Sequence, residues 1–308
     1  MGFGWVARLG GLSTGTDQMA GRVVMVTGAS NGIGRSTALG LARLGATVVM
    51  VCRNRERGTA VQGWISDLAG DVRLDLLVAD LSSQSQVRIL ATEFKGKYDR
   101  LDVLVNNAGV LMGHRTVTED GLETTFAVNH LAYFQLTALL SDRLAETAPS
   151  RVVNVASIAH ERGRLRFDDL QGEKRYGAVR AYAKSKLANI VFTYELARRL
   201  SGTGVTANCL DPGAIKTGLG KSRGGLAPRY WRLRQPFLAP EAKGAETPIY
   251  LASTAEVTEM SGGYWAERQL RSSSKRSYDA GDAKRLWDVS EDLLASKEGD
   301  QNPEGPNG

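Results

Sequence analysis

The chain has 308 residues, 42% of them hydrophobic, which is enough to bury one large core but short for two independent domains. Its net charge of +6 comes from Lys and Arg spread along the chain, which favours a basic surface for an anionic ligand over nucleic-acid binding. Cys52 and Cys209 lie in apolar runs without metal-type partners, so we expect reduced core thiols and no metal site. No apolar run is long enough to span a bilayer, and we therefore expect a cytoplasmic protein without a membrane span.

Short β-branched runs alternate along the chain with longer segments whose apolar residues recur at helical spacing. The predicted strands are residues 22–27, 47–52, 72–79, 101–106, 151–156 and 205–210. The predicted helices are residues 32–44, 82–97, 118–144 and 181–200. Asp80 and Ser82 are potential caps of the second of these helices, and Gly45 ends the first. Since strands that are apolar on both faces and joined by helices form parallel sheets, the order predicts an α/β, single-domain Rossmann fold with a doubly wound parallel sheet flanked by helices.

Composition changes at both ends of the chain, where Gly, Ser, Thr, Asn, Pro and charged residues are frequent. We therefore expect flexible segments at residues 1–20 and 297–308 around one domain at residues 21–296. Inside this domain, residues 218–240 interrupt the alternation with Gly, Pro, Arg and aromatic residues, and a loop of this length is usually functional. We interpret it first as a substrate lid that excludes water, with a weak contact to a membrane surface as the alternative.

A glycine-rich turn follows the first predicted strand and leads directly into a helix. It has the sequence Thr27-Gly28-Ala29-Ser30-Asn31-Gly32-Ile33-Gly34. Gly28 permits a tight turn, Gly32 lets backbone amides approach a pyrophosphate, and Gly34 allows the helix to pack closely on the strand. Because the flanking strand and helix are the context that such a motif requires, the turn predicts a dinucleotide site at the start of the helix.

The residue at the end of the second strand indicates which dinucleotide is bound, because a carboxylate there holds a ribose 2′-hydroxyl and a basic residue accepts a 2′-phosphate. Here Cys52 is followed by Arg53, with Arg55 and Arg57 close by and no carboxylate to repel a phosphate. NADP(H) is therefore favoured over NAD(H). The alternative is that these arginines only solvate the start of a helix.

Tyr182 and Lys186 are four residues apart in a predicted helix, which places them on one face. An ammonium beside a phenol favours the phenolate and lowers a pKa that starts near about 10, and an oxidised nicotinamide would add a second positive charge. Tyr182 would then give or take a proton at neutral pH. Taken alone, this spacing is more typical of an ordinary surface pair, and Lys184 would be an equal candidate for the partner of Tyr182.

Together with the glycine-rich turn, this pair makes the chain resemble the short-chain dehydrogenase/reductase family over about residues 21–294. Further motifs stand where the family has them, in order Asp80-Leu81, Asn106-Asn107-Ala108-Gly109, Asn129, Ser157 and Pro212-Gly213. The family usually has two serines at the end of the fifth strand. Here Ala156 takes the first of these positions, and Ser157 takes the second, catalytic one.

The resemblance implies a role for each of these residues. Asn129, Ser157, Tyr182 and Lys186 would be catalytic, with Ser157 bonded to the substrate oxygen and Asn129 holding the water that links Lys186 to solvent. Lys186 would also grip the nicotinamide ribose. The other cofactor contacts would be Asp80 and Leu81 at the adenine, Asn106, Ala108 and Gly109 along the cofactor floor, and Pro212, Gly213, Ile215 and Thr217 at the nicotinamide.

Within the family, several segments look like the retinol dehydrogenase branch, namely residues 129–134, 154–160, 185–189 and 277–287, together with the insert between Ser157 and Tyr182. The resemblance implies hydride transfer between nicotinamide and a carbonyl or alcohol. The aromatic and aliphatic residues of the predicted lid favour a bulky apolar substrate, such as a retinoid, steroid, lipid aldehyde or polyketide ketone. An NADP preference favours reduction. The family commonly pairs the helices that carry Asn129 and Tyr182, which implies a homodimer or tetramer. The alternatives are a non-redox biosynthetic step on the same fold and a non-catalytic NADP(H) sensor.

Overall fold

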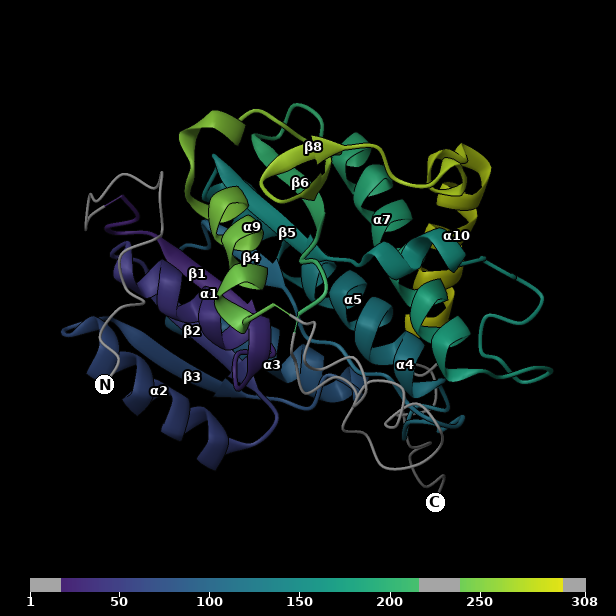
Figure 1. Ribbon diagram of the computed structural model, residues 1–308, viewed down its shortest axis with the longest axis horizontal. Coiled ribbons are helices and arrows are strands. Elements are labelled where there is room, and N and C mark those ends of the chain that lie inside the picture. The colour runs from purple at the N-terminus through teal and green to yellow at the C-terminus, as the bar shows by residue number, and fades with distance from the viewer. Residues whose placement is uncertain (1–17, 216–238, 296–308) are drawn as a thin grey trace, which may run out of the picture.

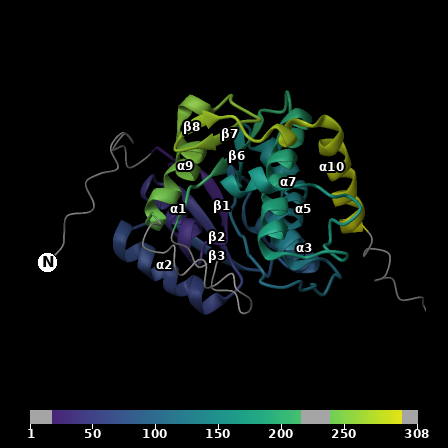
Figure 2. The ribbon, with the colours of Figure 1, turned by 45° about the vertical axis from the view of Figure 1, so that its right-hand side comes forward.

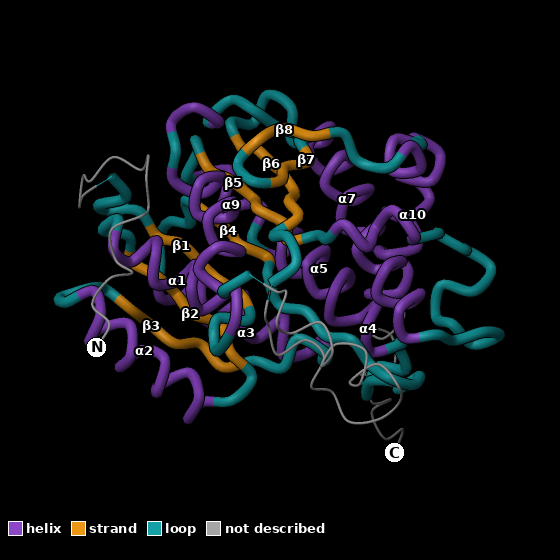
Figure 3. The backbone as a smooth tube through the Cα atoms, in the orientation of Figure 1, coloured by secondary structure: helices purple, strands orange, loops and turns teal. Residues whose placement is uncertain are grey.

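The predicted strands pair into one sheet within residues 18–215 and 239–295, the part of the chain that the computed structural model describes. The eight strands lie in the order β3-β2-β1-β4-β5-β6-β7-β8 (Figure 3). They are β1 (Val23–Thr27), β2 (Thr47–Cys52), β3 (Leu74–Val78), β4 (Val103–Asn106), β5 (Ser150–Val155), β6 (Val205–Asp211), β7 (Tyr264–Ala266) and β8 (Gln269–Arg271). Strands β1 to β7 run parallel, and β8 pairs with β7 in the antiparallel sense. The predicted doubly wound α/β architecture is confirmed.

Helices cover both faces of the sheet, because the strands are apolar on both sides (Figures 1 and 2). One layer consists of α1 (Gly32–Arg43), α2 (Arg55–Ala69) and α9 (Glu241–Ser253), which pack on alternate strand residues such as Val24 and Val26. The other layer consists of α3 (Gln84–Lys97), α5 (Ala132–Leu139), α6 (Ser141–Glu146) and α7 (Ala178–Arg199). Helix α10 (Ala280–Ala295) packs outside α7, where Trp287 contacts Phe134 and Phe192. Within the described residues, no helix combines the length and the hydropathy needed to cross a membrane.

The predicted helix at residues 118–144 is interrupted in the structure. Gly121 adopts φ +75°, and a bridge between Val117 and Glu123 closes a turn before any helix starts. Glu123 then caps the short α4 (Thr124–Phe126), with its carboxylate accepting hydrogen bonds from the backbone amides of Thr125 and Phe126. A π-helical turn, η1 (Ala127–Leu131), connects α4 to α5. The apolar pattern of the sequence is the same across these breaks, so it could not reveal them.

The start of α3 also differs from the prediction. Ser83, rather than Asp80 or Ser82, is its N-cap and accepts a hydrogen bond from Gln86 N. The Asp80 carboxylate instead accepts from the backbone N–H and hydroxyl of Ser82, which shapes the turn that precedes the helix. Gly45 follows the end of α1 with φ +88°, as predicted for a glycine that ends a helix.

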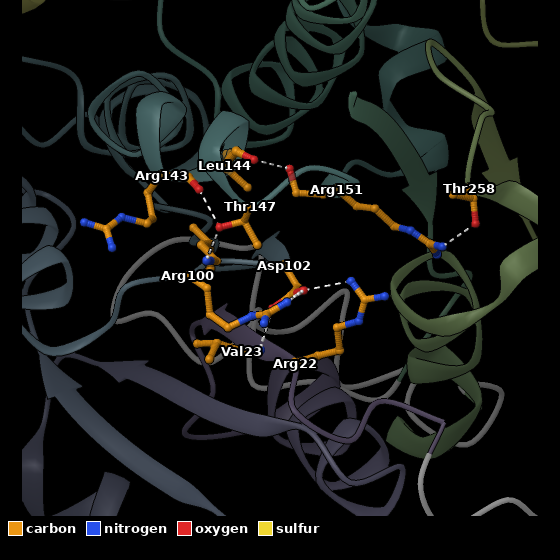
Figure 4. Close-up of polar contacts among 11 residues, drawn as sticks. Arg22, Val23, Arg100, Asp102, Arg143, Leu144, Thr147, Arg151 and Thr258 are labelled. Carbon is orange, nitrogen blue, oxygen red and sulfur yellow. Dashed lines mark hydrogen bonds and ion pairs between the residues drawn. The ribbon is translucent and has the colours of Figure 1, made fainter. Parts of the chain in front are cut away.

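A buried carboxylate holds the amino-terminal edge of the sheet (Figure 4). Asp102, which is 2% exposed, accepts hydrogen bonds from Val23 N, Arg22 and Arg100 at 2.7–2.8 Å and so joins β1 to β4. Burial alone would raise the pKa of Asp102, but the hydrogen bonds outweigh it and the pKa lies below its usual value. This anchored edge leaves the opposite, carboxyl edge of the parallel strands for a ligand site.

The predicted terminal segments and the predicted lid lie largely outside the described residues. Of residues 1–20 and 218–240, the structure describes only residues 18–20, Ala239 and Pro240, and residues 297–308 are also outside it. Ala239 N donates to Ala214 O at 2.9 Å, and Ala239 forms a bridge with Ile215. The described end of the predicted lid, at Ala239, therefore lies beside the residues that follow β6.

Candidate active site

The glycine-rich turn connects β1 to α1 at the carboxyl edge of the sheet. Gly28 has φ +68°, in the left-handed region that favours glycine. A Cβ on Gly34 would lie 2.4 Å from both Gly28 O and Asn107 Nδ2, so only glycine lets α1 begin this close to the turn. Asn31, the N-cap of α1, makes no side-chain cap hydrogen bond, and the first turn of the helix holds no acidic residue. The start of α1 therefore has the form of an anion site.

Asn107 fixes this turn to the segment that follows β4. Its Nδ2 donates to Thr27 O at 2.8 Å, while Thr27 Oγ1 accepts from the backbone amides of Asn107 and Ala108 at 2.9 and 3.1 Å. The resemblance placed Asn107 on the cofactor floor, and the structure shows that its side chain also fixes the glycine-rich turn. The neighbouring Asn106 side chain is fully buried and donates to Thr137 and Asn154, so any cofactor contact of Asn106 would come from its backbone.

Arg53 and Asp80 lie opposite each other at the ends of β2 and β3. The side chain of Arg53 is 74% exposed, and its Nη1 lies 3.7 Å from Asp80 Oδ2. Ser30, in the glycine-rich turn, hydrogen-bonds to the thiol of Cys52 just before Arg53. Leu81 packs against the core under α3. The structure therefore brings the predicted adenine-end residues together beside the phosphate turn.

Helix α7 carries Tyr182 and Lys186 to the end of β5, where Ser157 begins the short 3-10 helix η2 (Ile158–Arg162). Lys186 is 3% exposed, and its Nζ donates to Val155 O at 2.9 Å and lies 5.7 Å from the centre of the Tyr182 ring. Ser157 Oγ accepts from Ala159 N at 3.2 Å and hydrogen-bonds to Tyr182. Segments far apart in sequence thus place two hydroxyl groups and an amine in one site.

Asn129 lies in the π-helical turn, a local geometry that is frequent at functional sites. Both N–H groups of its amide are used, because Nδ2 donates to Val110 O and Ser185 Oγ at 2.9 and 3.0 Å, and Oδ1 accepts from Val110 N at 2.7 Å. A Cβ on Gly109 would lie 3.5 Å from Asn129 Oδ1 and 3.7 Å from Lys186 Nζ. Gly109 therefore lies next to both the Asn129 amide and the Lys186 ammonium, and the Asn129 side chain holds the loop after β4.

Tyr133 is a site residue that sequence reasoning missed. It is four residues after Asn129, its hydroxyl donates to Ala108 O at 2.8 Å, and its ring centre lies 5.7 Å from Lys186 Nζ. The hydrogen bond ties α5 to the cofactor floor next to the lysine. The spacing from Asn129 was the signal that could have found it, since residues four apart share a helix face.

The pKa values of Tyr182 and Lys186 differ from the prediction. Burial raises the pKa of Tyr182 to about 12, with the Asp211 carboxylate acting in the same direction and the Ser157 hydrogen bond in the opposite one. Burial also lowers the pKa of Lys186 to about 7. The predicted lowering of the Tyr182 pKa by Lys186 is therefore wrong for the protein without cofactor, because both charged forms lose their hydration in the same buried site.

The segment that follows β6 contributes the last group of predicted site residues at the carboxyl edge of the sheet. Asp211 accepts from Ile158 N at 3.1 Å, which fixes η2 directly after Ser157. Pro212 and Gly213 follow Asp211 as predicted, and Gly213 N also hydrogen-bonds to the Asp211 carboxylate. Ile215 is 6% exposed and packs beside Gly244 of α9. Thr217, the last predicted nicotinamide contact, lies outside the described residues.

The insert between η2 and α7 packs beside the site and resolves the alternative partner of Tyr182. Lys184 Nζ donates to Leu170 O in the insert, so Lys184 does not face Tyr182. Tyr176 OH donates to Met112 O at 3.0 Å, and Arg115 Nε donates to Gln171 O at 2.9 Å. The insert is thus bonded to the chain that follows the cofactor floor.

Comparisons with known proteins agree with this geometry. A family model described as short chain dehydrogenase matches residues 22–225. Retinol dehydrogenase 12 of Mus musculus is 43% identical over 285 residues, covering 92% of this chain and 90% of that protein. Retinol dehydrogenase 11 of Homo sapiens is 43% identical over 284 residues, covering 92% and 89%.

Solved structures are similar over most of the chain. A putative uncharacterized protein from Mycobacterium paratuberculosis superposes with a TM-score of 0.72 at 35% identity, covering 89% of this chain and 94% of that one. A short chain dehydrogenase from Shigella flexneri, complexed with NADP, has a TM-score of 0.67 at 25% identity, covering 82% and 100%. The chain therefore belongs to the short-chain dehydrogenase/reductase family, in its retinol dehydrogenase-like branch, and is a nicotinamide-dependent oxidoreductase acting on CH–OH groups.

Proposed function

We propose that the chain is an NADP(H)-dependent reductase of ketones or aldehydes on bulky apolar substrates such as retinoids, steroids, lipid aldehydes or polyketide ketones. The observation that carries this proposal is the meeting of Ser157, Tyr182 and Lys186 beside an uncapped helix start. The retinol dehydrogenases that share 43% identity with the chain make a retinoid the first substrate to test.

The residues of the carboxyl edge fit a dinucleotide with a 2′-phosphate. The uncapped start of α1 suits a pyrophosphate, and the exposed Arg53 at the end of β2 suits the 2′-phosphate. Lys186 and the residues that follow β4 and β6 would hold the nicotinamide end. When bound, the nicotinamide would supply the hydride, and the protein would supply orientation and the proton.

The two hydroxyls are arranged to act on one substrate oxygen. Ser157 Oγ accepts a hydrogen bond from Ala159 N, which leaves its own proton available to donate to a substrate oxygen. A carbonyl oxygen between them would accept hydrogen bonds from both Ser157 and Tyr182, and these donors would stabilise the negative charge that develops there. A pKa of about 12 keeps the Tyr182 proton in place at neutral pH, which suits a proton donor in reduction.

Exposed apolar side chains close in sequence to Ser157 and Tyr182 support an apolar substrate. Ile158, directly after Ser157, and Val179, one helical turn before Tyr182, are each 53% exposed. An apolar substrate that covered them would gain from removing this surface from water.

A carbonyl panel followed at the nicotinamide absorbance tests the proposal. Retinal, a steroid ketone and a long-chain aldehyde are compared with a small polar ketone, each with NADPH and with NADH. We expect turnover of the apolar members with NADPH. Tight NADPH binding without turnover of any member would select the sensor, and a product formed without change in the nicotinamide would select a non-redox step.

A homo-oligomer and a cytoplasmic location stay predictions. Helix α10 lies along α7, and the Trp287 ring centre is 4.8 Å from that of Phe134 and 5.9 Å from that of Phe192. Pairing through this face of α5 and α7 would displace α10, so we propose that an oligomer uses another surface. The molar mass of the full chain is measured by light scattering before and after α10 is cross-linked to α7. An oligomer that uses another surface keeps its mass after cross-linking, whereas one that pairs through α5 and α7 does not form.

A further inference from the structure

The backbone of Ser157 is bonded to a part of the chain more than a hundred residues away through the ring of His160. His160 lies in η2 and is 1% exposed. Its Nδ1 is 2.7 Å from Ser157 O, and its Nε2 is 3.0 Å from the backbone N of Ser274. The ring also packs on Tyr264 of β7, with centres 5.0 Å apart. None of the roles derived above uses this side chain.

The two partners determine where the hydrogen of the ring lies. A backbone N–H can only donate, so His160 Nε2 accepts from Ser274 with its lone pair. A backbone carbonyl can only accept, so Nδ1 carries the hydrogen and donates to Ser157 O. Both contacts are satisfied at once by the neutral ring with hydrogen on Nδ1.

The segment that holds Ser274 is itself fixed to the helix that carries Tyr182. Ser273 Oγ lies 2.6 Å from Tyr194 OH of α7, and the Tyr194 and Tyr278 rings stack with centres 5.2 Å apart. Ser277, which is 1% exposed, bonds to both Ser273 Oγ and Ser274 O at 2.6 Å. Contacts therefore run from α7 through residues 273–278 to His160 and on to Ser157.

We infer that His160 is a positioning residue that locks the Ser157 backbone to residues 273–278 and so fixes the Ser157 hydroxyl against Tyr182. The inference rests on the proposed function and adds a residue to it. Small displacements of reacting groups are costly, since a shift of about 1 Å can lower a rate about 100-fold. Loosening this connection would therefore lower kcat, while cofactor binding, which uses other residues, would be kept.

Ser274→Pro removes one end of the connection without touching the catalytic residues. Ser274 has φ −63°, which a proline ring adopts without strain, and its Oγ makes no hydrogen bond within the described residues. The substitution thus deletes the N–H that His160 accepts. Lys275→Pro is the matched control, because it places a proline at the first position of a helical turn, where proline is tolerated, and keeps the Ser274 N–H.

We expect Ser274→Pro to lower kcat by about 10- to 100-fold on any carbonyl that the wild type reduces, with an unchanged KM for NADPH. Lys275→Pro should retain wild-type kcat, with a melting temperature similar to that of Ser274→Pro. An unchanged kcat in Ser274→Pro, or equal losses in both variants, would overturn the inference.

A second measurement does not depend on activity. The chain has three histidines, so nitrogen NMR of histidine-labelled wild-type protein resolves each ring, and His160→Gln identifies the signal of His160. We expect the neutral form with hydrogen on Nδ1. Hydrogen on Nε2 would overturn the inference even if the enzyme is active, whereas a wild type that reduces no carbonyl would count against the proposed function alone.

Discussion

Replacing Tyr182 with Phe tests the proposed chemistry most directly, because it removes one oxygen and keeps the ring. In the structure this hydroxyl meets Ser157 next to Lys186 at the carboxyl edge of the sheet. The lost hydrogen bond is of the kind worth about 1 kcal/mol, so the folded state should survive. NADPH binding should survive too, since Lys186, Arg53 and the glycine-rich turn are unchanged.

The effect on the rate should be much larger than the effect on stability. General acid catalysis typically contributes about 100- to 10,000-fold, so kcat should fall by that factor. This loss corresponds to a barrier that is higher by about 3 to 5 kcal/mol. Wild-type reduction should lose activity at high pH, as Tyr182 gives up its proton. This loss should be absent from the residual activity of Tyr182→Phe.

The assay is steady-state NADPH oxidation over a range of pH, with NADPH affinity measured by fluorescence titration. Tyr264→Phe is the matched control, because this buried tyrosine also has a hydroxyl, and that hydroxyl has no hydrogen-bond partner within the described residues. It should keep the wild-type rate. Near-normal turnover by Tyr182→Phe would refute the reasoning and assign the proton donor elsewhere.

Three further predictions concern the cofactor and the fold. Arg53→Asp should weaken NADPH by about 2 kcal/mol or more and NADH far less, because a charged hydrogen bond to the 2′-phosphate becomes a repulsion; equal weakening in calorimetric titrations would make Arg53 structural. Burial lowers the pKa of Lys186 to about 7, so its charge is lost as the pH rises through that value. The affinity for the dinucleotide should therefore fall as the pH rises through about 7. Lys186→Met should bind the dinucleotide more weakly than the wild type and without this pH dependence. Asp102 has a lowered pKa, so it stabilises the fold above its unfolded pKa of about 3.9 and loses this effect as the pH falls through its folded value. Asp102→Ala should lower the free energy of unfolding in urea by about 2 kcal/mol at pH 7 and by much less in acid. The control Asp142→Ala, at an exposed ion pair, should lower it by less than about 1 kcal/mol. A loss for Asp102→Ala that is the same at every pH would contradict this explanation.

The first six strands and the glycine-rich turn could be predicted because their signals are local, whereas β7 and β8, of three residues each, were missed. A strand buried on both faces is recognised by its own β-branched run, and Gly28 and Gly34 stand where the backbone itself requires glycine. The spacing of Tyr182 and Lys186 is equally local, since a helix repeats within a few residues.

The break at residues 118–131 could not be predicted from the same kind of pattern. Apolar residues recur across α4, η1 and α5 without interruption, so their pattern resembles that of one continuous helix. What supports the turn is the side chain of Asn129, which bonds to Val110 and Ser185 from two other segments. The cap at Ser83 was also missed, because neighbouring polar residues offered equal candidates.

The sequence by itself determined which side chains stand at the carboxyl ends of the strands, because strand ends follow from the hydrophobic pattern of each segment. Only the tertiary structure decided what those side chains contact and how they titrate. The pKa values of Tyr182 and Lys186 depend on how completely other segments exclude water from them. The contact of His160 with Ser274 joins residues 114 apart, and since no local period relates such positions, folding alone brings them together.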